Sequence, residues 1–304
     1  MGTLYVVATP IGNLDDISPR ARKTLASVAL IAAEDTRHSK RLLRHFAITT
    51  PLVSYHQHNE RERRELLLRA LNAGDVALIS DAGTPAVSDP GADLVAAAHA
   101  AGHTVSPIPG PSALAAAVSA SGLITGPFVA LGFLPRETGS RRQAIARAGT
   151  SGMPFVLFEA ARRLPKTLAE LRDILGEREA VVLRELTKLH EEIRSGTLGA
   201  LREWAASETP PGEVVVVVGA APAARPEEDD VTRLVRDLRR AGLSASQTAR
   251  EAAAVTGLPR SDLYRLAQDL VPPSVGLERE LSLSDEDTLQ DALRDEKGPQ
   301  GRQS

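Results

Sequence analysis

A run of polar side chains that could take part in catalysis follows a short apolar segment near the N-terminus. Residues 32–39 (AAEDTRHS) place Glu34, Asp35 and Arg37 close together in the chain. A carboxylate can orient or deprotonate a hydroxyl, and an arginine can anchor an anionic substrate. The same side chains also have a structural interpretation, in which Glu34 or Asp35 pairs with Arg37 or caps the following helix. The sequence leaves both interpretations open.

Two further polar runs, residues 55–60 (YHQHNE) and 184–191 (RELTKLHE), come directly after predicted strands. His56 and His58 are too isolated from other ligand types to indicate a metal site, so we expect them at the surface or in contact with substrate. The chain has no cysteine, which rules out disulfides, thiolate catalysis and cysteine-bound metals. The sequence therefore predicts chemistry that requires no metal.

Loops rich in glycine and proline follow several predicted strands. These are residues 9–14 (TPIGNL), 80–91 (SDAGTPAVSDPG), 109–113 (PGPSA) and 132–136 (GFLPR). The first three are expected at the carboxyl ends of parallel strands, where open α/β sheets bind ligands. Glycine lets the backbone approach a ligand closely, and proline fixes the loop before binding. We predict a small-molecule site there.

The absence of two phosphate-binding motifs narrows the choice of ligand. Neither G-x-G-x-x-G after the first predicted strand nor G-x-x-x-x-G-K-[ST] occurs in the sequence. Loops lined by main-chain groups with few charges suit a ligand that carries an adenosine and an amino acid. S-adenosylmethionine fits this description, although the residues alone do not select it.

Short β-branched runs alternate with amphipathic segments over residues 1–121, a pattern typical of a mostly parallel sheet flanked by helices. Strands are expected at 4–8, 30–32, 52–54, 76–79 and 104–108, and helices at 18–27, 39–46, 60–73, 91–101 and 112–119. The alternation resumes over residues 122–222, with strands at 128–131, 155–158, 181–183 and 214–218 and a helix at 165–175. The sequence predicts two α/β domains.

A smaller helical module is expected at residues 231–270, where two glycine-containing turns separate three short helical patterns. Such a helix-turn-helix-like unit could contact nucleic acid, or it could serve only packing or dimerisation, and the sequence does not decide between them. Residues 274–304 carry eight acidic and four basic residues and are expected to be disordered. The sequence thus indicates a fourth, acidic segment after the module.

Charge and hydropathy limit the partners of the folded part. Without residues 274–304 the chain has 32 basic and 31 acidic residues, so it is no generic polyanion binder. No apolar run approaches the roughly 18 residues of a membrane span, and the N-terminus shows no secretory leader. We expect a cytoplasmic protein that has no membrane partner.

Seven motifs in order, TPIGNLDDIS, AAEDTRHS, SDAGTPAVSDPG, PGPSA, GFLPR, RELTKLHE and PGEVVVVV, give the chain a specific resemblance over about residues 4–219. In these motifs it closely resembles the bacterial 16S rRNA (cytidine-2′-O)-methyltransferases of the tetrapyrrole methylase superfamily. The resemblance implies a two-domain α/β fold with a C-terminal helical module. It also implies that S-adenosylmethionine binds between the domains and that the protein forms a homodimer.

The resemblance implies which positions contact the cofactor. Carried over residue by residue, they are Pro10, Gly12, Gly83, Thr84, Pro85, Val87, Ser88, Pro109, Gly110, Ser112, Ala113, Phe158, Glu159, Leu186 and Gly212. The sequence departs from the family at residues 158–163, where FEAARR replaces a run close to YESPHR. A role for a hydroxyl or an imidazole at those positions is therefore not expected.

The implied reaction methylates the ribose 2′-hydroxyl of a cytidine in the decoding region of 16S rRNA, in free RNA or in the small ribosomal subunit. DNA, which lacks that hydroxyl, is excluded as a substrate. We expect Glu34 or Asp35 to accept the proton and Arg37 to anchor a phosphate or ribose. The arginines expected to hold RNA are Arg37, Arg41, Arg141, Arg142 and Arg163.

Two alternatives remain at this stage. A tetrapyrrole C-methyltransferase would share the fold and the cofactor, but it would not explain AAEDTRHS or the helical module. A non-catalytic RNA-binding assembly factor would keep the fold without turnover, although the intact glycine and proline loops argue against it.

Overall fold

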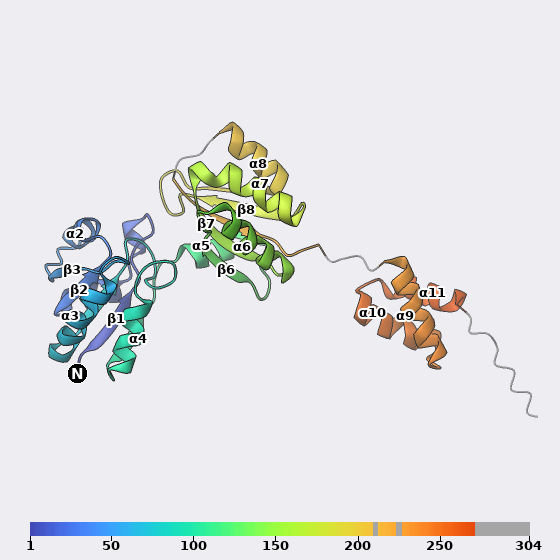
Figure 1. The fold of residues 1–304 in the computed structure, drawn as a ribbon, viewed down its shortest axis with the longest axis horizontal. Coiled ribbons are helices and arrows are strands. Elements are labelled where there is room, and N and C mark those ends of the chain that lie inside the picture. The colour runs from blue at the N-terminus through green and yellow to red at the C-terminus, as the bar shows by residue number, and fades with distance from the viewer. Residues whose placement is uncertain (209–211, 223–226, 271–304) are drawn as a thin grey trace, which may run out of the picture. The chain divides into compact units, whose positions relative to one another are not determined.

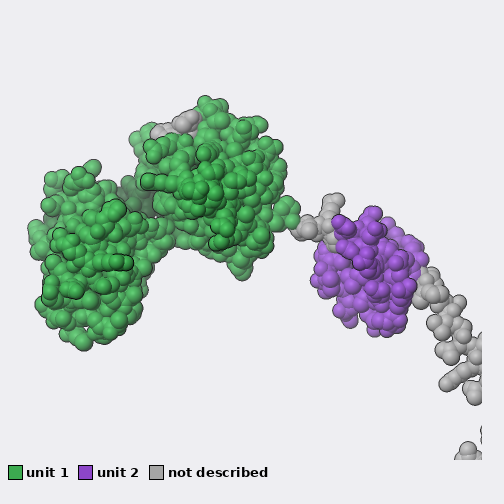
Figure 2. Space-filling model, in the orientation of Figure 1, with its two compact units in different colours: residues 1–223 green, residues 224–304 purple. Residues whose placement is uncertain are grey.

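The computed structural model describes residues 1–208, 212–222 and 227–270. It divides into two compact units, Met1–Ala223 and Ala224–Ser304 (Figures 1 and 2). Among the described residues, unit 1 contains two β-sheets with their helices, and unit 2 contains three helices. The segment 274–304, expected to be disordered, lies outside the described residues.

The first sheet of unit 1 has five strands in the order β3-β2-β4-β1-β5, and every pair is parallel. The strands are β1 (Thr3–Val7), β2 (Leu30–Ala33), β3 (Leu52–Ser54), β4 (Val76–Ile79) and β5 (Thr104–Ile108). Each lies within one residue of the predicted bounds, because apolar β-branched runs between turn residues mark buried parallel strands. The parallel α/β fold is confirmed.

Helices cover both faces of this sheet. They are α1 (Pro19–Ser27), α2 (Thr36–His45), α3 (Glu60–Ala73) and α4 (Ala92–Ala100), with a 3₁₀ turn η1 (Leu14–Asp16). Side chains of β4 alternate between the faces: Ala77 and Ile79 join the core under α1 and α2, and Val76 and Leu78 join the core under α3 and α4. This alternation explains why all four residues of β4 are buried.

Helix α5 (Ala113–Ser121) follows the last strand of the first sheet, but it packs against the second sheet. Its Ala117 is fully buried in a cluster with Val181, Val215 and Val217. A helix that follows the first sheet in the chain therefore covers one face of the second sheet.

The second sheet is mixed, with the order β6-β7-β10-β8-β9. Its strands are β6 (Val129–Phe133), β7 (Phe155–Ala160), β8 (Glu179–Arg184), β9 (Glu192–Thr197) and β10 (Glu213–Val218). Only β6 and β7 are parallel, and the other three pairs are antiparallel. The sequence did not predict β9, because this edge strand (EIRSGT) has no buried residue and lacks a continuous apolar run.

Three helices, α6 (Thr138–Thr150), α7 (Leu164–Leu175) and α8 (Leu198–Ser207), cover the face of the second sheet opposite α5, and η2 (Ala161–Arg163) precedes α7. Leu164, Leu168 and Leu171 of α7 are fully buried. They lie on one face of the helix because their spacing follows the helical repeat. Helix α7 was predicted to within one residue.

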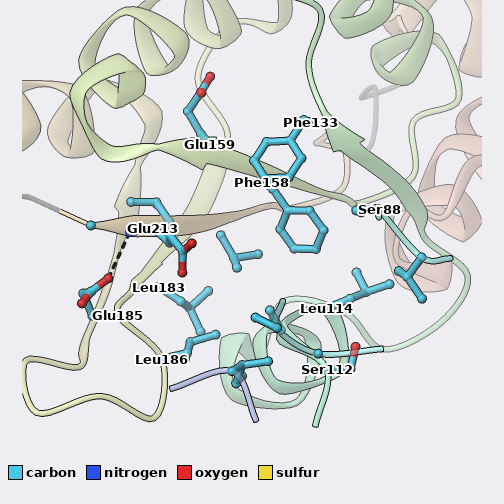
Figure 3. Close-up of a pocket in the computed structure, with 18 of the residues that line it drawn as sticks. Ser88, Ser112, Leu114, Phe133, Phe158, Glu159, Leu183, Glu185, Leu186 and Glu213 are labelled. Atoms are coloured by element: carbon cyan, nitrogen blue, oxygen red, sulfur yellow. Dashed lines mark hydrogen bonds between the residues drawn. The ribbon is translucent and has the colours of Figure 1, made fainter. Parts of the chain in front are cut away.

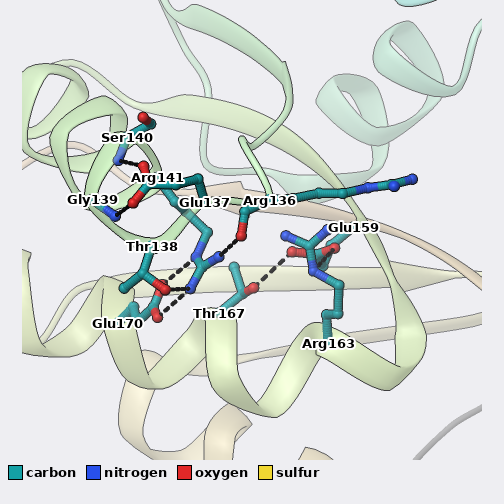
Figure 4. Close-up of polar contacts among 10 residues, drawn as sticks. All are labelled: Arg136, Glu137, Thr138, Gly139, Ser140, Arg141, Glu159, Arg163, Thr167 and Glu170. Atoms are coloured by element: carbon teal, nitrogen blue, oxygen red, sulfur yellow. Dashed lines mark hydrogen bonds and ion pairs between the residues drawn. The ribbon is translucent and has the colours of Figure 1, made fainter.

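A buried ion pair joins α6 to α7 (Figure 4). The Arg141 guanidinium donates to both carboxylate oxygens of Glu170, from Nε at 2.5 Å and from Nη2 at 2.6 Å. Its Nη1 donates to the main-chain oxygen of Arg136 at 2.9 Å. Arg141 is 3% exposed, so the prediction that it holds RNA is wrong. Its charge is instead neutralised inside the fold by Glu170.

The described part of unit 2, residues 227–270, forms α9 (Glu228–Arg240), α10 (Ala245–Thr256) and α11 (Arg260–Asp269) around its own apolar core. Helix α10 begins with a capping box, in which Gln247 N–H donates to Ser244 Oγ and Ser244 N–H donates to Gln247 Oε1. The core contains Val235, Ala249 and Leu263. Among the described residues, no helix is long and apolar enough to cross a bilayer.

The Arg141–Glu170 pair generates a prediction about stability. Replacing Glu170 with alanine leaves a buried guanidinium without its counterion, so we expect the free energy of unfolding to fall by about 3–5 kcal/mol. Arg172→Ala on the same helix removes an exposed ion pair with Glu177 and should cost less than about 1 kcal/mol. Denaturation can be followed by fluorescence of Trp204, the only tryptophan, which packs in the same core.

The same pair predicts the pH dependence of stability. The hydrogen bond from Arg141 holds the pKa of Glu170 below its ordinary value of 4.5. The Arg141–Glu170 pair therefore makes its full contribution to the free energy of unfolding above about pH 4.5. This contribution is lost as the pH falls below that value and Glu170 becomes protonated. Equal losses for Glu170→Ala and Arg172→Ala at neutral pH would contradict the assignment.

Candidate functional site

Three neighbouring strands of the first sheet, β4, β1 and β5, end at the same edge, and main-chain hydrogen bonds join the loops that follow them. Thr9 N–H donates to the Gly83 oxygen at 2.9 Å, and Gly83 N–H donates back to the Thr9 oxygen at 3.0 Å. The buried Thr9 Oγ1 donates to the Ser80 oxygen at 3.2 Å. The loops after β1 and β4 thus form one rigid piece.

Glycines allow this close approach. Gly83 has a φ of +81°, a conformation that disfavours other residues. A Cβ on Gly110 would lie 3.1 Å from the Cβ of Ala8, which is closer than most real side-chain contacts. Thr84 Oγ1 also donates to the Pro111 oxygen at 3.2 Å and ties the loop after β4 to the loop after β5. The glycine and proline motifs therefore shape the edge.

A cavity of about 360 Å³ lies between these loops and the ends of the second-sheet strands (Figure 3). The first half of unit 1 contributes Ile11, Ala82–Thr84, Val87–Asp89 and Ser112–Leu114. The second half contributes Phe133, Phe158, Glu159, Ala160, Leu183, Glu185, Leu186, Lys188 and Gly212–Val215. Most of these side chains are apolar or small, as in typical small-molecule pockets.

Ten of the fifteen residues predicted to contact the cofactor line this cavity. They are Gly83, Thr84, Val87, Ser88, Ser112, Ala113, Phe158, Glu159, Leu186 and Gly212. The other five, Pro10, Gly12, Pro85, Pro109 and Gly110, lie in the same loops without lining the cavity. Gly12 has a packing role, because a Cβ there would lie 2.5 Å from Lys188 Cγ and 2.8 Å from Thr187 Oγ1.

Glu159 lines the cavity, but its carboxylate points away from the other lining side chains (Figure 3). Neighbouring residues of a strand alternate between faces, so Phe158 points toward the cavity while the Glu159 side chain lies on the opposite face. Glu159 accepts a hydrogen bond from Thr167 Oγ1 at 2.7 Å and pairs with Arg163 at 3.3 Å. Glu159 therefore holds the turn after β7 in place.

Three charged residues in the cavity wall, Lys188, Glu185 and Glu213, form an ionic cluster that the sequence analysis did not predict. Lys188 Nζ donates to Glu185 Oε1 at 3.0 Å and to Glu213 Oε2 at 3.1 Å. Burial disfavours the charged form of Lys188, but these two hydrogen bonds outweigh it and raise the pKa of the amine. Lys188 therefore remains a cation. The signal available in the sequence was the polar run after a strand end, 184–191.

The loop after β8 has strained backbone. Glu185 and Thr187 adopt φ values of +50° and +66°, which residues with a Cβ rarely adopt. The Glu185 carboxylate accepts the N–H of Glu213 at 3.0 Å, and Glu191 accepts the N–H of Thr187 at 2.6 Å. Strain of this kind persists only where surrounding contacts fix it, and it concentrates at functional sites.

The predicted catalytic residues lie outside the cavity lining. Asp35 caps α2 by accepting the N–H of Arg37 at 2.8 Å, so the helix begins at Thr36 and not at residue 39 as predicted. The Asp35 carboxylate also pairs with the Arg37 guanidinium at 2.9 Å. The side-chain hydrogen bond from Arg37 lowers the pKa of Asp35 to about 2. Asp35 is thus a weak base whose contacts are those of a cap.

Glu34 has different surroundings. Its carboxylate accepts the N–H of Asp81 at 3.4 Å, in the loop that forms part of the cavity wall. Burial raises the pKa of Glu34, and the negative charge of Asp89, which lines the cavity, raises it further. Glu34 is therefore a stronger base than Asp35 and is coupled to the cavity through Asp89.

The histidine run does not form a metal site in the described part of the chain. His56 Nε2 lies 3.3 Å from Asn59 Nδ2, and the His56 and His58 rings are 5.9 Å apart. Across residues 1–208, 212–222 and 227–270, no group of three or more histidine, aspartate or glutamate side chains could hold a metal ion.

Comparison with known proteins places this geometry in a family. Residues 3–202 match the Tetrapyrrole (Corrin/Porphyrin) Methylases, and residues 225–270 match the RsmI C-terminal HTH domain. The structure also resembles uroporphyrin-III C-methyltransferase of Thermus thermophilus, solved in complex with S-adenosyl homocysteine. The TM-score is 0.50 at 22% identity, over 72% of this chain and 97% of that one. At that identity the likeness concerns the fold alone.

Two curated relatives carry the name ribosomal RNA small subunit methyltransferase I. The protein from Synechocystis sp. is 49% identical over 275 residues, covering 89% of this chain and 99% of its own length. The protein from Pseudomonas aeruginosa is 49% identical over 272 residues, covering 88% and 96%. The chain belongs to the tetrapyrrole methylase family and, within it, to the group of ribosomal RNA small subunit methyltransferase I proteins.

Proposed function

We propose that this protein transfers a methyl group from S-adenosylmethionine to the RNA of the small ribosomal subunit, at the 2′-hydroxyl of a cytidine in the decoding region. The observation that carries the proposal is the cavity between rigid glycine and proline loops, in a chain whose relatives named for rRNA methylation match it over almost their whole length. The helical match at residues 225–270 favours this group over the tetrapyrrole C-methyltransferases.

The cavity fits the cofactor. Main-chain groups of residues 82–84 and 112–114 offer partners for the amide-like edge of a purine, and Phe158, Leu114 and Val87 offer apolar contact. Asp89 and Glu213 add carboxylates that suit hydroxyl and ammonium groups. S-adenosylmethionine, when bound, supplies an activated methyl group. The protein then has to align the ribose oxygen with it and exclude water.

We propose Glu34 as the group that accepts the proton of the 2′-hydroxyl. Its raised pKa and its coupling to Asp89 distinguish it from Asp35. Asp35 is proposed as a positioning residue that holds Arg37 at the start of α2, where the arginine can contact a phosphate or the ribose. No step in this proposal uses a metal ion.

Methyl transfer from labelled S-adenosylmethionine tests the proposed function. We expect label to enter small ribosomal subunits or 16S rRNA as a single 2′-O-methylcytidine, identified by mass spectrometry, and not to enter a uroporphyrinogen. Transfer to the tetrapyrrole alone would contradict the proposal. Binding of S-adenosylmethionine without transfer to either substrate would favour a non-catalytic assembly factor.

The proposed base generates a prediction with a pH readout. Glu34→Gln should lower the methyl-transfer rate by about 10²- to 10⁴-fold and leave cofactor affinity nearly unchanged. The exposed Glu65→Gln serves as a control. Asp89→Asn removes a charge that raises the pKa of Glu34, so the acid limb of the rate profile should move to lower pH. Wild-type rates in Glu34→Gln would exclude Glu34 as the base.

The role of unit 2 is a separate proposal. We propose that it contributes to RNA binding, that the protein acts as a homodimer and that it works in the cytoplasm. Deleting residues 226–304 should weaken binding to 16S rRNA more than binding to S-adenosylmethionine, because the cavity lies wholly in unit 1. Filter binding and calorimetry measure the two affinities. Unchanged RNA affinity would restrict unit 2 to packing or dimerisation.

A further inference from the structure

An exposed aromatic ring lies at the edge of the cavity. Phe133, the last residue of β6, is 64% exposed, although it lines the cavity. Its ring packs against Phe158 with 5.5 Å between the ring centroids. Phe158 supports one side of the ring, and much of Phe133 remains open to solvent. Nucleobases of single-stranded RNA stack on aromatic side chains that are presented in this way.

Cationic side chains lie in the segments that follow Phe133 of β6 and Phe158 of β7 in the chain. Strands β6 and β7 are parallel, and Phe133 pairs in register with Phe158, so the loops that follow leave from the same edge of the sheet. The first loop leads to Arg136 and Arg142, and the second leads to Arg162 and Lys166. All four side chains are exposed, and none of them makes an ion pair with another described residue.

Buried contacts hold both loops in place (Figure 4). Arg141, paired with Glu170, donates to the main-chain oxygen of Arg136, and the Arg136 side chain extends away from that pair. Glu137 accepts the N–H groups of Gly139 and Ser140 and caps α6. Arg142 and Lys166 both lie close enough to Glu170 to help lower the pKa of its carboxyl. The Arg141–Glu170 pair therefore fixes α6, which carries Arg142, against α7, which carries Lys166.

We propose that Phe133, Arg136, Arg142, Arg162 and Lys166 form a binding surface for single-stranded RNA beside the cavity. Phe133 stacks on a base next to the ribose to be methylated, and the four cations contact phosphates. This surface rests on the proposed function, since it presents RNA to the same cavity. Of the arginines expected from the sequence, this surface includes Arg142. Arg141 is buried and Arg163 pairs with Glu159, so neither belongs to it.

Charge reversal tests the phosphate contacts with a 16S rRNA transcript as the probe. At about 0.1 M salt, Arg136→Glu combined with Arg162→Glu should weaken binding roughly 10- to 30-fold. It should also reduce the slope of log K against log salt concentration by about 1 to 1.5. Neither residue lines the cavity, so affinity for S-adenosylmethionine should stay the same.

A matched control lies on α6. Arg147 is exposed, has no ion pair among the described residues and lies in the last turn of the helix, whereas Arg142 lies near its start. Arg147→Glu should leave the RNA affinity and the salt slope close to wild type. If the double variant behaves like Arg147→Glu while the wild type binds RNA, the proposed surface is wrong. If the wild type binds neither RNA nor S-adenosylmethionine, the proposed function itself fails.

Stacking of an RNA base on Phe133 can be tested separately from the phosphate contacts. Phe133→Leu keeps an apolar side chain but loses the ring, and it should weaken RNA binding by about 5- to 100-fold without changing the salt slope. Phe133→Tyr should restore the affinity. Light scattering of the same variants identifies the competing occupant, a second copy of the chain. A change in particle mass with unchanged RNA affinity would overturn the stacking role.

Discussion

The burial of α5 against the second sheet is the interaction on which the site depends. The helix starts directly after Ser112, in a loop that forms one wall of the cavity, and its Ala117 packs against Val215 and Val217 of β10. Strand β10 begins with Glu213 and Val214, which line the cavity from the other side. One short apolar helix thus fixes the distance between the walls that would hold a ligand.

The loops then need little ordering when a ligand binds. Main-chain hydrogen bonds join Thr9 to Gly83, and Thr84 Oγ1 ties its loop to Pro111. On the opposite wall, the strained residues Glu185 and Thr187 are held by Lys188, Glu191 and the N–H of Glu213. These loops lose their conformational entropy when the protein folds, so ordering them costs little free energy when a ligand binds. The charged side chains of the cavity wall, such as Lys188 and Glu213, are also held in fixed positions, from which they can contact polar groups of a ligand.

Sequence patterns predicted the parts of the fold that local residue types determine. The strand Val76–Ile79 was found because four consecutive apolar residues lie between turns. The loops were found because glycine and proline cluster after strands, where positions such as Gly83 have a positive φ that favours glycine. The exposed strand β9 was missed, since an edge strand needs no apolar face. The role of Arg141 was missed because its partner Glu170 lies 29 positions away in the chain. Lys188 has one partner nearby, Glu185, but its second partner, Glu213, lies 25 positions away.

The exposed edge formed by β9 has a consequence for how the protein behaves at high concentration. An unpaired strand edge can template pairing with another chain, and proteins counter this by placing charge along it. Here Glu192 pairs with Arg184 and Arg194, and Arg194 also stacks over Trp204 at 4.5 Å. These side chains put charge along the edge strand, which disfavours the edge-to-edge pairing that leads to fibres.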